Sequence, residues 1–167
     1  MRGETGKTKR GERSRDRHGD TLTARQRSLC MSRIRSTDTS PEVAVRSMLF
    51  RMGYRFCLHR RDLPGCPDIV LPRHKKIILV HGCFWHMHRC RRGRAVPKTR
   101  RKYWSDKREG NVRRDRKCLK ELRDLGWDVL VVWECWVPKA ERLREHLAAF
   151  ISMPAPLSGP GAASSAS

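Results

Sequence analysis

Residues 67–90 of the chain read PDIVLPRHKKIILVHGCFWHMHRC, two short apolar runs followed by a loop rich in histidine and cysteine. The runs predict strands over Asp68–Leu71 and Lys76–Val80, separated by Pro72-Arg73-His74. Their isoleucine and valine residues follow one another without alternation, which is typical of strands buried on both faces. We therefore expect a sheet at the centre of the fold.

Helix and strand patterns continue on both sides of these two strands. The sequence predicts strands over residues 54–58 and 127–133, and helices over residues 23–35, 111–125 and 138–151. A further helix ends at Gly53 and has two possible starts: Thr39 caps it with Glu42 three residues later, or Ser40 caps it with Pro41 in the first turn. The order α-α-β-β-β-α-β-α predicts an α/β fold in which a mixed sheet is flanked by helices.

The length of 167 residues is typical of one domain, and we expect its ordered part to span residues 21–152. Residues 1–20 carry interspersed charges without apolar periodicity, so we expect a disordered basic N-terminal extension. Residues 153–167 are rich in Pro, Gly, Ala and Ser, which predicts a disordered tail.

The net charge of +21 is the main indication of a partner. Such a charge favours a polyanion, above all nucleic acid. A membrane is disfavoured, because the longest apolar run, Val129–Trp133, is far shorter than the ~20 residues that span a bilayer, and the first twenty residues lack the apolar stretch of a signal peptide. Seven cysteines without an export signal favour metal binding or buried thiols over disulfides. We expect a soluble intracellular protein that binds nucleic acid.

A metal-ligand pattern lies in the loop after the second of the two strands. Cys83, His88 and Cys90 have the spacing Cys-x4-His-x-Cys, and Cys135 follows the next long apolar strand. Three thiolates and one imidazole suit tetrahedral zinc, and a closed set of four ligands is typical of a structural site. The alternative is a set of buried thiols and a surface histidine. For the remaining cysteines we expect buried thiols: Cys30, Cys57, Cys66 and Cys118.

A second polar group gathers where the predicted strands begin and end. Asp68 opens one strand, and a carboxylate there is costly to bury unless it binds a cation or a network of donors. His81 and His86 follow the neighbouring strand and should reach a similar edge of the sheet. Such carboxylates are ligands of Mg²⁺. Glu42 is either a second carboxylate of this site or a residue that stabilises the helix dipole, and Asp68 alone would be read as a turn residue.

The basic residues concentrate in one segment. Residues 86–120 hold fifteen Lys and Arg against three Asp and Glu, with Tyr103 and Trp104 among them. This density indicates a surface that contacts phosphates, although many charged runs are simply solvated. Phe84 and Trp85 are either core residues or wedges that enter between base pairs.

Motifs along the chain follow the order and spacing of one known family. They are Met31-Ser32-x-Ile34-Arg35-Ser36-x-Asp38-Thr39-x-Pro41-Glu42, Leu63-Pro64-Gly65-x-Pro67-Asp68, His81-Gly82-Cys83-Phe84-Trp85-His86-x-His88-x-Cys90, Asn111-Val112-x-Arg114-Asp115, Gly126-Trp127 and Val132-Trp133-Glu134-Cys135. Over roughly residues 25–150 the chain resembles the very short patch repair (T:G mismatch-specific) DNA endonucleases. The His-Gly-Cys-Phe-Trp-His motif is highly diagnostic of that family.

The resemblance implies a restriction-endonuclease-like core of the PD-(D/E)xK type, with a structural zinc and a catalytic magnesium, so that residues 21–152 would be the endonuclease domain. Asp68 and the main-chain carbonyl of Val80 would hold Mg²⁺. His86 would be the general base or orient the water, and His81 and Glu42 would complete the active centre. The implied zinc ligands are Cys83, His88, Cys90 and Cys135.

The resemblance also implies the substrate and the reaction. Phe84, Trp85 and Trp104 would insert into DNA beside the mismatch, and one strand would be nicked on the 5′ side of the thymine in a T:G pair. Such pairs arise when 5-methylcytosine deaminates, which implies a functional link to a DNA cytosine methyltransferase and to repair proteins. We expect a monomer in the bacterial cytoplasm.

The chain departs from the superfamily pattern at few positions. Val80 stands where some relatives have threonine, and the acidic-x-Lys half of the superfamily signature is missing after Asp68, as it is in this family generally. Two alternatives stay open: a restriction-type nuclease without mismatch specificity, and a non-catalytic DNA-binding protein stabilised by zinc.

Overall fold

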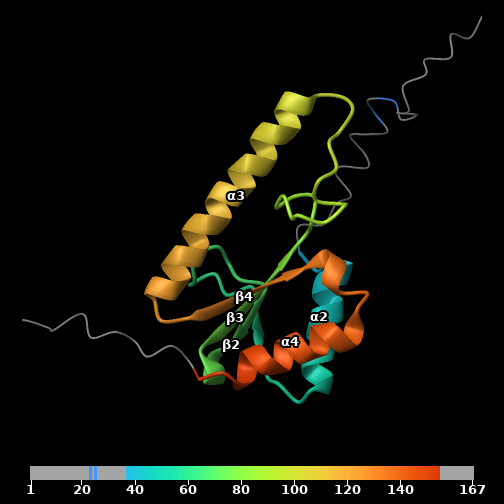
Figure 1. The fold of residues 1–167 in the computed structure, drawn as a ribbon. Helices are drawn as coiled ribbons and strands as arrows, with labels where there is room; N and C mark the ends of the chain where they lie inside the picture. The colour runs from blue at the N-terminus through green and yellow to red at the C-terminus, as the bar shows by residue number, and fades with distance from the viewer. Residues whose placement is uncertain (1–22, 24, 26–36, 155–167) are drawn as a thin grey trace, which may run out of the picture. The chain divides into compact units, whose positions relative to one another are not determined.

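The computed structural model describes residues 23, 25 and 37–154, and its centre is a four-stranded sheet (Figure 1). Strands β1 (Cys57–Leu58), β2 (Ile69–Leu71), β3 (Lys76–His81) and β4 (Asp128–Trp133) follow one another in that order across the sheet. The pairs β1–β2 and β2–β3 are antiparallel, whereas β3–β4 is parallel. The predicted α/β class with a mixed sheet is therefore confirmed.

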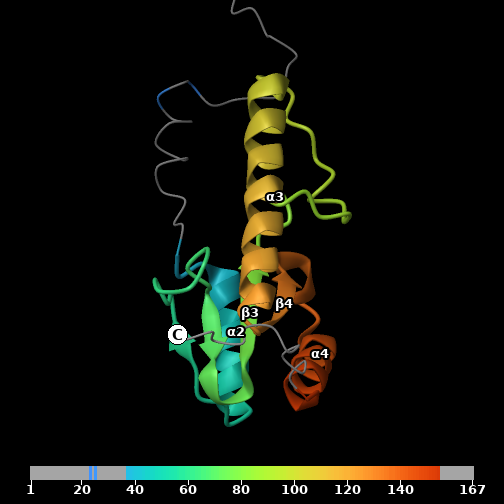
Figure 2. The same ribbon diagram turned by 90° about the vertical axis from the view of Figure 1, so that its left-hand side faces the viewer.

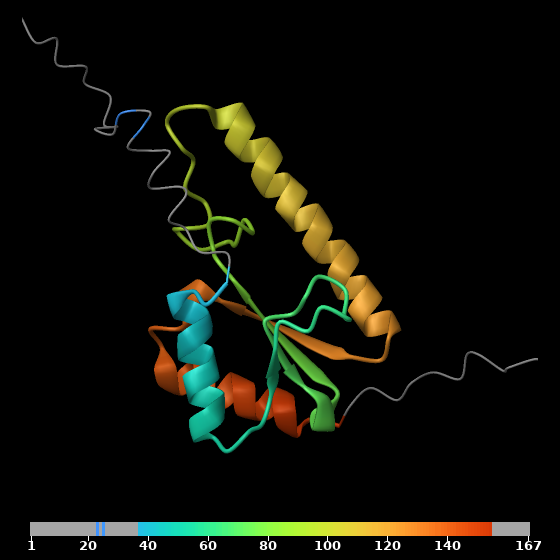
Figure 3. The same ribbon diagram turned by 180° about the vertical axis from the view of Figure 1, so that it is seen from behind.

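Helices cover both faces of this sheet. Helices α2 (Ser40–Arg51) and α4 (Ala140–Ser152) lie on one face, and α3 (Arg101–Asp124) lies on the other (Figure 3). Successive residues of β3 point to opposite faces. Ile78 accordingly belongs to the cluster that contains the buried residues of α2 and α4, whereas Ile77 packs with Leu122 of α3. Burial on both faces explains the unbroken apolar runs of the two central strands.

The start of α2 decides between the two predicted caps. Thr39 is the N-cap residue, and its carbonyl oxygen accepts a hydrogen bond from the Val43 N–H at 3.0 Å. The Thr39 hydroxyl donates to Glu42 Oε1 at 2.8 Å, so the pair with Glu42 forms through side chains. Pro41 lies in the first turn, and Gly53 follows the helix with φ +86°, a conformation that favours glycine.

The long helix differs most from the prediction. It begins at Arg101, not at Asn111, so much of the expected basic loop is helical. The first half of α3 extends past the sheet and lies beside the loop that precedes it (Figure 2). The hydrogen bonds to this loop come from Arg108, which donates to Gly93 and Ala95, and from Asn111, whose side chain donates to the Trp85 carbonyl. These inward residues are polar, so the sequence carries no apolar periodicity there.

Smaller corrections concern the ends of other elements. The strand predicted over residues 54–58 is reduced to Cys57–Leu58, and both of its residues are exposed at the edge of the sheet. The strand predicted from Trp127 begins at Asp128, and the last helix spans Ala140–Ser152. The predicted helix over residues 23–35 lies outside the described residues apart from Thr23 and Arg25, as do residues 1–20 and 155–167. The domain boundaries stay predictions.

Lys76 opens β3 from a fully buried position. Its Nζ donates to Asp128 Oδ2 at 2.7 Å and lies 4.6 Å from the centre of the Phe150 ring. Because Asp128 opens the parallel neighbour β4 opposite Lys76, this ion pair fixes the register of β3 and β4 at their starts. None of the helices within the described part of the chain is long and apolar enough to cross a membrane.

Candidate active site and metal cluster

Asp68 lies directly before β2, and its side chain makes a hydrogen bond to β3. Its Oδ2 accepts a hydrogen bond from the Val80 N–H at 2.8 Å. Burial raises the pKa of Asp68, the bond from Val80 lowers it, and the nearby charge of Glu42 raises it further. Its other oxygen has no hydrogen-bond partner among the described residues. A half-buried carboxylate with one oxygen unpaired suits a divalent cation, so the residues fit the expected magnesium.

A pocket of about 220 Å³ opens at this end of the sheet. It is lined from separate elements by the five acidic or imidazole side chains Glu42, Asp68, His81, His86 and Asp115, together with Val80 and apolar neighbours. The structure therefore brings together all four predicted catalytic residues and the residue whose carbonyl is expected to bind metal. Charged and imidazole groups that converge in one pocket are typical of an active site.

The two histidines of the pocket are stacked on each other. The ring centres of His81 and His86 lie 3.9 Å apart with 15° between their planes. Burial, followed by the charge that His86 can carry, lowers the pKa of His81 to about 4. His81 is thus neutral at pH 7 and can act there as a hydrogen-bonding group without adding charge.

Asp115 is the residue of the pocket that the sequence did not assign to it. His86 Nδ1 lies 2.5 Å from Asp115 Oδ2, so Nδ1–H donates to the carboxylate and Nε2 is left to accept a proton. Asp115 lies in α3 between Val112 and Leu119, which line a second hollow beside His86. The sequence feature that could have indicated Asp115 is its helical spacing from the apolar residues Val112 and Leu119.

Glu42 takes both roles that the sequence allowed. It is 3% exposed in the first turn of α2, and it also lines the pocket. Its Oε2 accepts from the Asp38 N–H at 3.0 Å and from Arg46 Nη2 at 2.9 Å, while Oε1 accepts from Thr39. Because both oxygens are engaged, Glu42 is held rigidly against the site. Asp38, Glu42 and His59 also form a compact group, but the Arg46 guanidinium already supplies its positive charge.

The four residues of the predicted zinc site lie together. The ligand atoms of Cys83, His88, Cys90 and Cys135 are all within 4.8 Å of one another. His88 Nδ1 lies 3.7 Å from the Cys83 sulfur and 3.5 Å from the Cys135 sulfur. Tetrahedral zinc with ordinary bond lengths separates its ligand atoms by about 3.5–3.8 Å. The cluster is thus able to hold zinc, and it joins the loop after β3 to the turn Glu134–Trp136 after β4.

The thiols of this cluster have opposite tendencies. Burial raises the pKa of Cys83 to about 12. A hydrogen bond from the Gly93 N–H, opposed by desolvation, lowers the pKa of Cys90 to about 6. Zinc binds the thiolate form, so its charge would have to hold Cys83 deprotonated in its apolar surroundings.

The other cysteines divide into two groups. Cys57 and Cys66 are exposed, so the expectation of buried thiols is wrong for both of them. Cys57 lies in the edge strand β1 and Cys66 in the turn before Asp68, where neither is covered by a helix. Cys118 is half-buried on α3, and Cys30 lies outside the described residues.

Three aromatic residues meet between the cluster loop and α3. The ring centres of Phe84, Trp85 and Trp104 lie 5.3–6.0 Å apart. All three are half-buried, and none belongs to the two buried core clusters. Arg108 supports them: it is 6% exposed, its guanidinium lies 4.6 Å over the Phe84 ring, and it donates to the Ala95 carbonyl at 3.0 Å.

The chain is similar to nucleases of one family. The family described as DNA mismatch endonuclease Vsr matches residues 19–92, which include Asp68, His86 and the first three residues of the metal cluster. The type II nicking enzyme V.XorIIP of Xanthomonas oryzae pv. oryzae is 52% identical over 116 residues, which cover 70% of this chain and 85% of that protein. The type II nicking enzyme V.NmeAIP of Neisseria meningitidis is 41% identical over 128 residues, which cover 77% of this chain and 91% of that protein. The DNA mismatch endonuclease Vsr of Escherichia coli K12 is 41% identical over 120 residues, which cover 72% of this chain and 76% of that protein.

The relatives identify this α/β fold, with a pocket of carboxylates and imidazoles beside a Cys/His cluster, as that of a nuclease. With these relatives, the chain belongs to the Vsr, or very short patch repair, family of DNA mismatch endonucleases. It is therefore a hydrolase that cleaves DNA in mismatch repair, and the alternative of a non-catalytic DNA-binding protein is set aside.

Proposed function

We propose that the protein nicks one DNA strand on the 5′ side of the thymine in a T:G mismatch, in a reaction that depends on Mg²⁺. The observation that carries this proposal is the convergence of Asp68, His81, His86 and Asp115 in one pocket. The half-buried aromatic cluster beside it supports the mismatch as the target, because apolar wedges enter most easily where a duplex is already weakened.

Asp68 and the main-chain carbonyl of Val80 would hold the magnesium ion. When bound, Mg²⁺ polarises the scissile phosphate and lowers the pKa of a bound water. The Val80 N–H fixes one oxygen of Asp68, which leaves the second oxygen as the ligand. The raised pKa of the half-buried Asp68 also makes a cation favourable there, because a bound charge offsets the cost of burial.

His86 accepts the proton of the attacking water at Nε2. Asp115 holds the ring from Nδ1, so it is a positioning residue that fixes the tautomer needed for this transfer. His81 stacks on His86 and stays neutral, which avoids a second positive charge next to the base. Glu42 orients this side of the pocket through its bonds to the start of α2 and to Arg46.

Zinc held by Cys83, His88, Cys90 and Cys135 would be structural. These four side chains would supply a complete set of ligands for the ion, which is typical of a structural site. The bound ion would fix the loop that carries His86 and the aromatic residues, so that its binding energy becomes folding energy at the site.

Phe84, Trp85 and Trp104 would insert beside the mismatch and unstack it. We further propose a monomer of the bacterial cytoplasm, with the restriction-endonuclease-like PD-(D/E)xK core that the resemblance implies. The link to a cytosine methyltransferase and repair proteins follows from the origin of T:G pairs in deaminated 5-methylcytosine.

A second candidate function is nicking of intact duplex by a restriction-type nuclease. The names of two relatives, which are type II nicking enzymes, favour it. Phe84, Trp85 and Trp104 favour the mismatch reaction, since an enzyme for intact duplex needs no aromatic cluster to detect a distorted pair.

The deciding experiment offers the purified protein duplexes that differ only in one C:G or T:G pair at a methylation site. Nicks are counted with Mg²⁺ and with excess chelator, and the Asp68→Asn variant is the control for contaminating nucleases. Nicks confined to T:G duplexes and dependent on magnesium support the proposal. Equal nicking of both duplexes supports the restriction-type reaction instead.

A further inference from the structure

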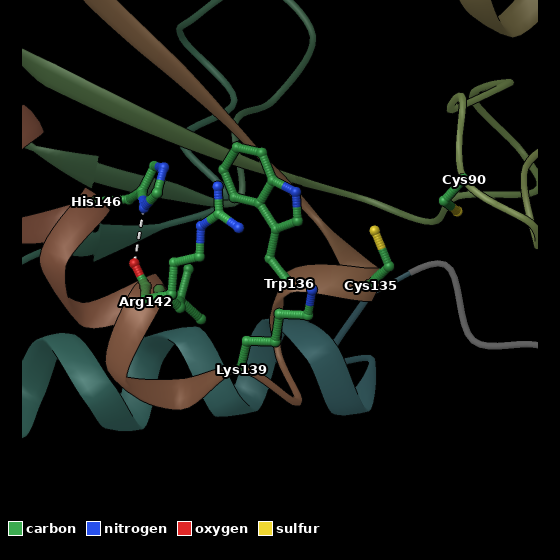
Figure 4. A pocket seen from close by; sticks show the side chains of 7 residues that line it. Cys90, Cys135, Trp136, Lys139, Arg142 and His146 are labelled. Atoms are coloured by element: carbon green, nitrogen blue, oxygen red, sulfur yellow. Dashed lines mark hydrogen bonds between the residues drawn. The ribbon is translucent and has the colours of Figure 1, made fainter.

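A third hollow, distinct from the active-site pocket and from the hollow beside His86, lies at the start of α4. It has a volume of about 410 Å³ and is lined by Cys90, Cys135, Trp136, Lys139, Arg142, Leu143 and His146. It shares no lining residue with the active-site pocket. Figure 4 shows Trp136, Lys139 and Arg142 gathered at one side of the hollow, with His146 beyond them and the two cysteines at the other side.

The hollow carries two cations, Lys139 and Arg142, and it is bordered by two thiols of the metal cluster, Cys90 and Cys135. None of the side chains that line it is a carboxylate, and neither Lys139 nor Arg142 forms an ion pair within residues 37–154. Other lysines of the described chain do have acidic partners, such as Lys120 with Asp124. Two unpaired cations in one concave site select an anion, and the guanidinium of Arg142 suits the oxygens of a phosphate.

His146 adds a third nitrogen group. Its Nδ1 lies 2.7 Å from the Arg142 carbonyl oxygen and donates to it, so the other ring nitrogen, Nε2, is left for a ligand. The His146 ring also lies 5.3 Å from the Trp136 ring.

The floor of the hollow is apolar. The half-buried Trp136 packs against the core cluster that contains the buried Leu143. An inorganic anion alone would use only the cations, whereas a nucleotide would use both parts, with its phosphate at the cations and its base against the indole. The volume is within the roughly 300–1,000 Å³ of ordinary ligand pockets.

We propose that this hollow binds a nucleotide unit, with its phosphate at Lys139 and Arg142 and its base against Trp136. The source of the unit is either a nucleotide of the DNA strand away from the nicked bond or a free mononucleotide. The inference uses the DNA-directed activity of the family and does not depend on the assignment of the catalytic residues.

The first experiment titrates thymidine 5′-monophosphate into the full chain and follows the indole N–H signal of Trp136 by NMR. Trp136→Phe identifies the signal. We expect a saturable shift, at least tenfold weaker in Lys139→Ala/Arg142→Ala and within twofold of the parent in Arg144→Ala. Arg144 lies on the same helix but lines a different hollow, so it is a matched control. The absence of a saturable shift, or an equal shift in the double variant, overturns the proposal.

The second experiment distinguishes the sources in the Asp68→Asn background, in which DNA is bound but not cut. If the unit belongs to a DNA strand, a T:G duplex displaces the mononucleotide, and the double variant lowers the slope of log Kd against log salt by about 0.9 for one lost phosphate contact. If duplex and mononucleotide bind independently and the slope is unchanged, the ligand is a free nucleotide. Both readouts measure binding, so failure of the proposed nicking reaction leaves them interpretable. Lys139 and Arg142 are exposed, so both variants should fold, and the single Arg142→Ala variant repeats the test.

Discussion

Replacing Arg108 by methionine should loosen the aromatic cluster and destabilise the fold around it. Arg108 donates to the carbonyl oxygens of Gly93 and Ala95 and lies 4.6 Å over the Phe84 ring. Hydrogen bonds from a charged donor contribute about 1.5–3 kcal/mol each, and a partly desolvated cation–π contact contributes about 1–2 kcal/mol. Arg108 Nε is buried without a hydrogen-bond partner in the described chain, and removing it recovers about 1–3 kcal/mol.

The balance of these contributions is a loss of about 4 kcal/mol in the free energy of unfolding. Urea unfolding followed by circular dichroism measures it, and Arg113→Met is the matched control, because Arg113 is exposed on the same helix. Nicking of a T:G duplex should fall at least tenfold in Arg108→Met, because the loop that presents Phe84 is no longer held. If Arg108→Met unfolds within about 0.5 kcal/mol of the control and nicks at the same rate, Arg108 does not support the cluster.

Three further predictions concern the pocket and the metal cluster. His86→Ala should abolish nicking with little loss of DNA binding. Asp115→Asn should lower kcat by about 100-fold while KM changes little, because the imidazole loses its anionic partner. A gel assay of nicking that gives an unchanged kcat in either variant would contradict the role of His86 as the general base. Asp68→Asn should abolish nicking while raising the thermal stability of the metal-free protein, since a half-buried charge is removed; a lower melting temperature would refute the account of Asp68 burial. Cys135→Ser should lower both the bound zinc, measured by atomic emission, and the melting temperature, whereas Cys57→Ser, at an exposed thiol, should change neither.

Apolar periodicity predicted the centre of the fold well. The unbroken runs of β2 and β3 are buried on both faces, as continuous Ile and Val runs indicate. Turn and cap residues predicted the start of α2, where Thr39 and Glu42 meet through their side chains. Both features depend on residues close together in the chain, so they can be recognised from the sequence.

The first half of α3 could not be predicted in the same way. Its inward positions follow helical spacing, but after Trp104 they are occupied by the polar Arg108 and Asn111, which give no hydrophobic period. Arg108 and Asn111 bind main-chain carbonyls of an irregular loop instead of packing in a core. Such a helix is stabilised by partners that only the folded chain brings near it.

The site was predicted in its residue types but not in its pairings. Asp68 and the histidines were identifiable because they end or open apolar strands, and the metal cluster because of its spacing. Asp115 was not, since it reaches His86 from a helix that lies far along the chain. The hollow at the start of α4 was also missed, because Trp136, Lys139 and Arg142 resemble ordinary surface residues until the fold makes them concave.

The metal cluster has a topological consequence for folding. A metal ion bound by both Cys83 and Cys135 would close a loop of about 50 residues, and this loop contains α3 and β4. By the chain-entropy relation for cross-links, closing such a loop lowers the conformational entropy of the unfolded chain, which stabilises the folded state by about 4 kcal/mol. Loss of the metal would then first loosen the loop after β3, which carries His86 and the aromatic residues, before the buried strands and Leu122 of α3 separate.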